Sequence, residues 1–206
     1  MKIPENFLYY LSLHRECSER LLAGARELKA EDVEISLHPE ALRIRKMVHA
    51  VLGEVHRMKA FVRLSPQGAS VLYGFLKPVN RIGEHICDHF ARRNTGMIIV
   101  LGNGNEAWIS LCREGRIRRD HGKGLAETLE KLKAALPQEA DSRIDVKGLW
   151  QVYYDSQYCP ERKNQAAFRR HMPRRDQDAA GIRLVQNKKN ATLGEFLGES
   201  EGCTKK

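Results

Sequence analysis

The sequence predicts an α+β fold in which a central antiparallel sheet, in the order β-β-α-β-β, is flanked by helices and followed by a polar, basic C-terminal tail. Three observations lead to this prediction. Apolar residues recur at helical spacing in residues 4–29 and 39–55, and they alternate with polar residues in residues 56–64. Turns rich in glycine and asparagine then separate short apolar runs between residues 97 and 119, as in β-hairpins.

The N-terminal part of the chain is predicted to be helical. Residues 4–29 read as one helix with an irregular apolar stripe, and residues 39–55 read as a stronger one. Pro39 suits the first turn of a helix, where its missing N–H is not needed. The stripe of this second helix consists of Leu42, Ile44, Met47, Val48, Val51, Leu52 and Val55.

The segment His56–Leu64 is predicted to be a strand, because apolar and polar residues alternate along it. Residues 65–68 (SPQG) read as a turn, and Val71–Lys77 reads as a second strand that returns antiparallel to the first. In the first strand Met58, Ala60, Val62 and Leu64 would face the core, whereas Arg57, Lys59, Phe61 and Arg63 would face outward.

The remaining elements follow from shorter patterns. We expect helices at residues 80–93, 125–136, 145–158 and 164–172, and strands at residues 97–101, 106–112 and 116–119. These elements suggest one domain over residues 1–175, with N-terminal helices in 1–55, the sheet core in 56–120 and C-terminal helices in 121–175. Residues 176–206 are polar and poorly patterned, so we expect a mostly mobile tail in which only residues 193–196 dock.

Composition narrows the class of protein. The chain has 206 residues, a formal net charge of +9, and no apolar run of the roughly 18 residues that a membrane span needs. Its five cysteines are scattered singly without a CxxC pair, which suits reduced thiols in the cytoplasm. We therefore expect a cytoplasmic protein with no membrane partner, no metal and no cofactor.

The positive charge is concentrated in two blocks. Residues 41–93 carry ten basic and three acidic side chains, and residues 161–175 carry six basic and one acidic side chain. Residues 1–40, in contrast, carry five basic and eight acidic side chains. Two basic blocks that meet in space would bind phosphates, although each block also fits a solvated helix face.

The outward face of the predicted strand is the most specific candidate for nucleic-acid binding. Its arginines and lysine could hold phosphates, and its aromatic ring could stack on a base. The alternative is a strand covered by a helix, with its charges at the edge. Together with cations elsewhere in the basic blocks, the candidate residues are Arg57, Lys59, Phe61, Arg63, Arg93, Arg162 and Asn164.

Motifs for known chemistry are scarce. No glycine-rich phosphate loop stands between a strand and a helix, and no HExxH motif occurs. His85 and His89 have the spacing of metal ligands on a helix, but a third ligand is not evident, so we expect no metal. An enzyme acting on nucleic acids or nucleotides would use His56 or His89 as general acid–base, and it would need a pocket that joins them to Arg93.

Several short segments, in the same order and spacing, resemble an uncharacterised bacterial family of DNA metabolism proteins, DUF4130. They lie within residues 45–175: 54–63 (EVHRMKAFVR), 73–78 (YGFLKP), 89–93 (HFARR), 149–154 (LWQVYY), 162–164 (RKN) and 171–173 (HMP), with 193–196 (LGEF) as a closing piece. The resemblance implies a role in DNA repair, because members of the family stand beside a radical-SAM protein or are fused to a uracil-DNA-glycosylase-like domain. It implies no catalytic residues.

Three hypotheses of function follow. The first is a DNA-binding accessory factor in DNA repair or DNA metabolism. The second is the enzyme with His56 or His89 described above. The third is a module that binds a protein partner, such as the radical-SAM protein that the resemblance implies, through an exposed apolar patch around Phe75, Trp108 or Trp150.

Overall fold

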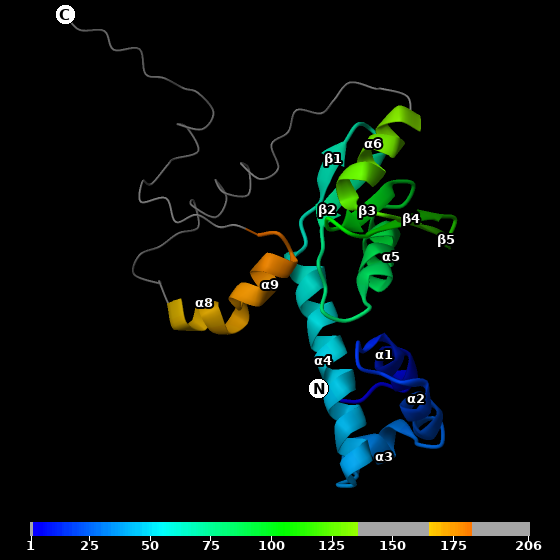
Figure 1. Cartoon of the computed structure of the whole chain (residues 1–206), viewed down its shortest axis with the longest axis vertical. Coiled ribbons are helices and arrows are strands. Elements are labelled where there is room, and N and C mark those ends of the chain that lie inside the picture. The colour runs from blue at the N-terminus through cyan, green and yellow to red at the C-terminus, as the bar shows by residue number, and fades with distance from the viewer. Residues whose placement is uncertain (1, 136–164, 183–206) are drawn as a thin grey trace, which may run out of the picture.

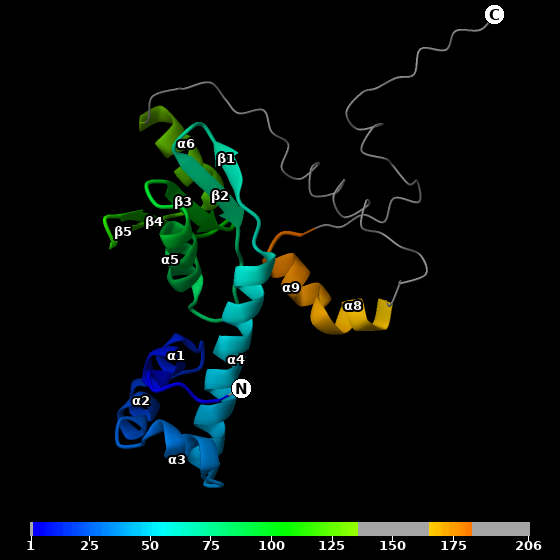
Figure 2. The same ribbon diagram turned by 180° about the vertical axis from the view of Figure 1, so that it is seen from behind.

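The structure is a computed structural model that describes residues 2–135 and 165–182, and it confirms the α+β class. Figures 1 and 2 show a five-stranded sheet at one end and a bundle of short helices at the other, joined by a long helix. The helices are α1 (Phe7–Leu13), α2 (Glu19–Ala25), α3 (Ala30–Ile35), α4 (Pro39–Phe61), α5 (Gly83–Arg93), α6 (Leu125–Ala135), α8 (Gln165–His171) and α9 (Arg174–Ala179). The strands are β1 (Ser65–Gln67), β2 (Val71–Phe75), β3 (Ile98–Gly102), β4 (Ala107–Arg113) and β5 (Arg116–Gly122).

The long helix α4 contradicts one prediction. It starts at Pro39 as expected but continues through Phe61, so the predicted strand over residues 56–64 is wrong. The apparent alternation also contains a helical period, because Val55, Met58 and Val62 are buried at spacings of three and four residues, whereas Ala60 is exposed. The helical stripe that begins at residue 41 therefore runs on without a break.

The sheet is mixed, which corrects the prediction of an antiparallel sheet. Its strands lie in the order β1-β2-β3-β4-β5, and every neighbouring pair is antiparallel except β2 and β3, which are parallel. Helix α5 provides the crossover that two parallel strands require. The predicted first strand is replaced by β1, three residues that the sequence suggested as a turn, and the chain reverses at Gly68 with a φ of +63°.

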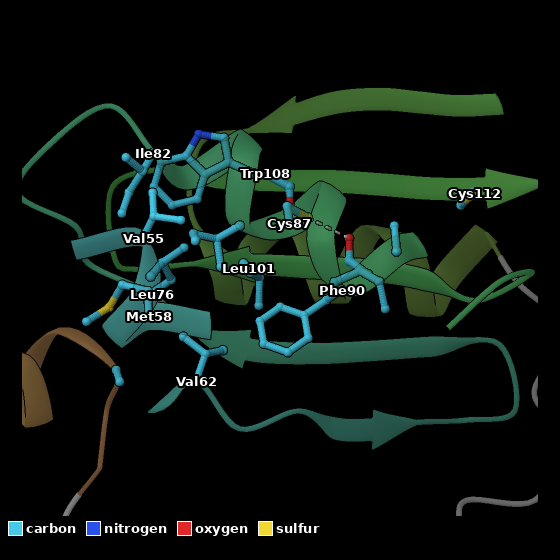
Figure 3. Packing of buried hydrophobic residues seen from close by; sticks show 14 of the residues in the cluster. Val55, Met58, Val62, Leu76, Ile82, Cys87, Phe90, Leu101, Trp108 and Cys112 are labelled. Carbon is cyan, nitrogen blue, oxygen red and sulfur yellow. Dashed lines mark hydrogen bonds between the residues drawn. The ribbon is translucent and has the colours of Figure 1, made fainter. Parts of the chain in front are cut away.

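Helices cover both faces of the sheet (Figure 1). On one face α5 and the end of α4 bury a core that includes Ile99, Leu101 and Trp108. Figure 3 shows Leu101 and Trp108 among the packed side chains of this core. On the other face Val71, Val100 and Ala107 pack against the apolar side of α6. The helices and strands predicted in residues 80–136 are thus confirmed, with β5 longer than expected.

The N-terminal helices form a second core against the first half of α4. The single helix predicted over residues 4–29 is instead two short helices, α1 and α2, because the chain turns at residues 14–18. Ser18 begins α2, and its hydroxyl accepts a hydrogen bond from the Leu21 N–H at 3.3 Å. This core contains Phe7, Leu11 and Val33 packed against Ile44 and Val48.

The C-terminal segment docks against the end of α4 (Figure 2). Helix α8 confirms the helix predicted at residues 164–172. The mobile tail was predicted to begin at residue 176, but that residue lies within helix α9. Asp176 and Ala180 are buried, and the Lys77 N–H donates to the Ala179 carbonyl at 2.9 Å. The predicted helix at residues 145–158 and the segment 193–196 lie outside the described residues. Within residues 2–135 and 165–182, no helix is long and apolar enough to cross a membrane.

Candidate nucleic-acid interface

Three cations gather where the last turns of α4 and α5 lie side by side. Lys59 extends from α4, and Arg92 and Arg93 end α5; we refer to these three residues as the α4–α5 cation cluster. Lys59 is half-buried, and its pKa is lowered by desolvation and by the charge of Arg92. The pKa of His89, one turn before Arg93, is lowered by desolvation and then by Lys59, Arg93 and Arg92. Lys59 and Arg92 therefore lie within electrostatic range of each other, and His89 lies within range of all three cations.

The α4–α5 cation cluster has no acidic partner in the part of the chain that the structure describes. None of its three side chains forms an ion pair, although Arg57 and Arg119 both do. The pKa of Lys59 is lowered first by desolvation and then by repulsion from the like charge of Arg92. An anion bound among the three cations would remove this repulsion.

A neutral imidazole lies beside the cation cluster. Burial and, after it, the charges of Lys59, His89 and Arg92 together lower the pKa of His85 from 6.5 to about 4, against an opposing effect of Asp88. His85 Nδ1 and the Tyr9 hydroxyl share a hydrogen bond of 3.0 Å, which joins α5 to α1. His85 Nε2 is buried, and no described residue makes a hydrogen bond to it. The side chain is thus a fixed, uncharged ring near neutral pH.

We expect His85 to titrate near pH 4, whereas an ordinary histidine titrates near 6.5. Because the unfolded chain would bind its proton in this interval and the folded chain would not, the stability contributed by His85 is complete above pH 6.5 and is lost as the pH falls toward 4. Proton NMR of the imidazole C–H, assigned with His85→Asn, measures the midpoint. A midpoint near 6.5 would contradict the buried, cation-flanked position of the ring.

Two carboxylates of α5, one and two turns before Arg92, pair with a guanidinium of β5. Asp88 accepts hydrogen bonds from the Ser110 hydroxyl at 2.8 Å and from Arg119 Nη2 at 2.7 Å. Glu84 pairs with the same guanidinium at 3.1 Å and lies 3.6 Å from His121 Nε2. This network ties α5 to the edge strand β5. The pKa of Tyr9 is raised by desolvation, the largest cause, and also by the charges of Asp88 and Glu84, which therefore act on it.

Comparison with known proteins supports the resemblance seen in the sequence. A family described as a domain of unknown function, DUF4130, matches residues 16–178. The chain belongs to the DUF4130 family. No curated protein and no solved structure matches it. The matched range begins before α2 and ends within α9, so it contains α4, α5 and the whole sheet.

In this DUF4130 protein, the predicted binding face is divided between two sides of α4. Arg57 and Lys59 are two residues apart, which places them about 200° apart around a helix rather than on one face. Arg57 Nε lies 2.8 Å from the carboxylate of Asp176 in α9, and Phe61 packs against the core beneath α5. Arg57 therefore holds α9 in place and Phe61 belongs to the core, so the prediction of one face shared with Lys59 is wrong.

The other predicted residues are placed differently. Arg63 lies just after α4, and its guanidinium donates to the Ala60 carbonyl at 2.6 Å, so it caps the helix end. His89 and Arg93 lie together on α5, as the enzyme hypothesis requires. His56 is exposed on α4, and no hydrogen bond or ion pair joins it to another described residue. Arg162 and Asn164 lie outside the described residues.

Sequence reasoning missed two members of the site in the DUF4130 protein. Tyr9 was assigned only to a helix, and His85 was considered only as half of a metal-binding pair. Within the described ranges, no group of three or more His, Cys, Asp or Glu side chains is placed to hold a metal ion. A contact between residues 76 positions apart leaves no local signal, so Tyr9 and His85 could be joined only by the folded chain.

Proposed function

We propose that this protein binds DNA through the α4–α5 cation cluster and serves as an accessory factor in DNA metabolism. The observation that carries the proposal is the convergence of three cations that have no acidic partner among the described residues. Elsewhere the fold neutralises guanidinium groups near α4 and α5, as Arg57 with Asp176 and Arg119 with Asp88 demonstrate. The clustered cations thus differ from these arginines in leaving their charge available to a ligand.

Phosphate is the anion that best suits this arrangement. Two adjacent guanidinium groups offer paired N–H donors, which match the oxygens of a phosphate, and a lysine adds a third charge. Neighbouring phosphates of a nucleic acid would engage several cations at once and release bound counterions. His85 and His89 lie within range of the charges of these cations, and because their pKa values are lowered they add no competing charge at physiological pH.

The wider role rests on the family resemblance. A part in DNA repair, beside a radical-SAM protein, is the expectation that the resemblance raised. The structure contributes the surface with which such a factor would hold DNA. The proposed surface differs from the one suggested by the sequence, because Arg57 pairs with α9 and Phe61 packs against the core, and the cations of α5 take their place.

The double variant Arg92→Ala/Arg93→Ala tests the proposal. We expect it to weaken DNA binding and to reduce the slope of log K against log salt by about two, since each lost phosphate contact lowers that slope by about one. Fluorescence anisotropy with labelled DNA at several salt concentrations measures both quantities. Circular dichroism and thermal unfolding establish that the variant remains folded.

A matched control lies on the other side of the sheet. Arg116 and Arg118 are exposed on β5, and their alternation along the strand places them on the face that α6 covers. Arg116→Ala/Arg118→Ala removes the same charge, so it should leave the affinity within about twofold of the wild type, apart from a small long-range effect. Equal losses in the two double variants would refute a specific role for the α4–α5 cation cluster.

A further inference from the structure

An exposed aromatic ring borders the α4–α5 cation cluster. Tyr9 is 44% exposed, although its ring contacts two others. The ring centroids of Tyr9 and Tyr10 are 5.3 Å apart in an edge-on arrangement, and those of Tyr9 and His85 are 5.8 Å apart. Its hydroxyl is engaged by His85 Nδ1. The part of Tyr9 that remains available to a ligand is therefore its ring rather than its hydroxyl.

His85 connects this ring to the cations. It contacts Tyr9 directly, and the charges of Lys59 and Arg92 both act on it. His85, His89 and Arg92 follow one another at spacings of four and three residues, so they lie along one side of α5, with about 5.4 Å per turn. The aromatic ring and the cluster thus lie at successive positions along one stretch of surface.

We propose that this surface takes a single strand of DNA, with one base stacked on Tyr9 and the adjoining phosphates on Lys59, Arg92 and Arg93. The inference rests on the proposed function and narrows its ligand. A base of a single strand exposes its flat face to a protein ring, whereas the bases of a duplex are already stacked on one another. An aromatic ring beside a groove of cations is the arrangement that single-strand binders use.

The surroundings of Tyr9 suit this task. Because the ring is held by a hydrogen bond and by two ring contacts, little conformational entropy would be lost when a base packs on it. The uncharged His85 supports the ring without adding a charge beneath it. The nearby carboxylates of Glu84 and Asp88, which would repel phosphates, both pair with Arg119, whose charge offsets one of the two and so reduces the repulsion.

The test compares three DNA probes of about 12 nucleotides: a mixed-sequence strand without secondary structure, its fully abasic analogue and its duplex. We expect the wild type to bind the normal strand more tightly than the other two. Tyr9→Leu should weaken binding of the normal strand about tenfold and leave binding of the abasic strand unchanged. Tyr9→Phe keeps the ring and removes the hydroxyl, so it should bind within about twofold of the wild type.

The outcomes separate this inference from the proposed function. If Tyr9→Leu binds the normal strand as the wild type does, or if the duplex binds as tightly as the strand, the stacking inference is overturned. The proposed function survives that result when Arg92→Ala/Arg93→Ala still weakens binding. Failure of the wild type to bind any of the three probes would overturn both. Thermal unfolding of each Tyr9 variant ensures that a loss of affinity is not a loss of fold.

Discussion

Replacing Glu54 by alanine should lower the free energy of unfolding by about 3 kcal/mol, because it leaves three donors, two of them buried, without an acceptor. Glu54 is 5% exposed. One carboxylate oxygen accepts the Val79 N–H at 2.6 Å, and the other accepts the backbone N–H of Asn80 at 3.1 Å and its side-chain amide at 2.6 Å. Chemical denaturation measures the loss as a lower midpoint at an unchanged slope.

Two further variants serve as controls for the unfolding measurement on Glu54→Ala. Glu54→Gln retains one carbonyl oxygen but places an NH₂ group against an N–H donor, so its loss should be intermediate. Glu130→Ala removes an exposed carboxylate on α6 and should change the free energy of unfolding by no more than about 0.5 kcal/mol. A loss below about 1 kcal/mol in Glu54→Ala would show that water satisfies the loop donors as well as the carboxylate does.

Glu54 also affects the candidate site, through the loop that leads into α5. Asn80 accepts a hydrogen bond from the Arg15 N–H at 3.1 Å, and the Arg81 N–H donates to the Leu13 carbonyl at 2.9 Å. The buried carboxylate therefore joins α4, the loop before α5 and the end of α1. These are the three elements that bring Lys59, His85 and Tyr9 together.

Elements defined by local patterns were predictable from the sequence. Residues 98–102 form a short apolar run, and the Gly102–Asn105 turn that follows leads into β4, so this hairpin was expected and is confirmed. Helix α5 was also expected, because its apolar residues recur at helical spacing. In these segments the local pattern and the tertiary contacts agree.

The end of α4 shows where local patterns fail. In residues 55–62 the apolar residues satisfy two periods at once, since Met58, Ala60 and Val62 alternate while Val55, Met58 and Val62 follow a helix. Only the packing partner decides between them, and the core beneath α5 selects the helical set. This error placed Arg57 and Lys59 on one face, and the candidate surface changed with it.

The partners of charged residues were beyond sequence reasoning as well. Asp176 is 119 positions away from Arg57, and the residue pattern of neither segment predicts their ion pair at 2.8 Å. Blocks of net charge indicated that phosphates could be bound. They could not distinguish arginines that the fold neutralises from those that it leaves without an acidic partner.

The substitution Gly83→Ala should lower the free energy of unfolding by about 3 kcal/mol, although alanine is favoured over glycine in helices by about 1 kcal/mol. A Cβ at this first residue of α5 would lie 2.1 to 2.4 Å from ring atoms of Trp108. The indole is 9% exposed and is fixed among the side chains of the core, as Figure 3 shows. Because neither α5 nor the ring can yield freely, overpacking outweighs helix propensity. Urea unfolding, compared with that of the wild type, measures the loss.

A double-mutant cycle tests the stated cause. Trp108→Leu alone removes a large part of the core and should destabilise the protein, but in the Gly83→Ala background it also removes the clash. The double variant should therefore be more stable than the sum of the two single losses predicts. Gly104→Ala adds a Cβ with no atom within 4 Å, and it should be nearly neutral. Additive losses in the cycle would mean that alanine at position 83 acts on the backbone at the start of α5 and not through the tryptophan.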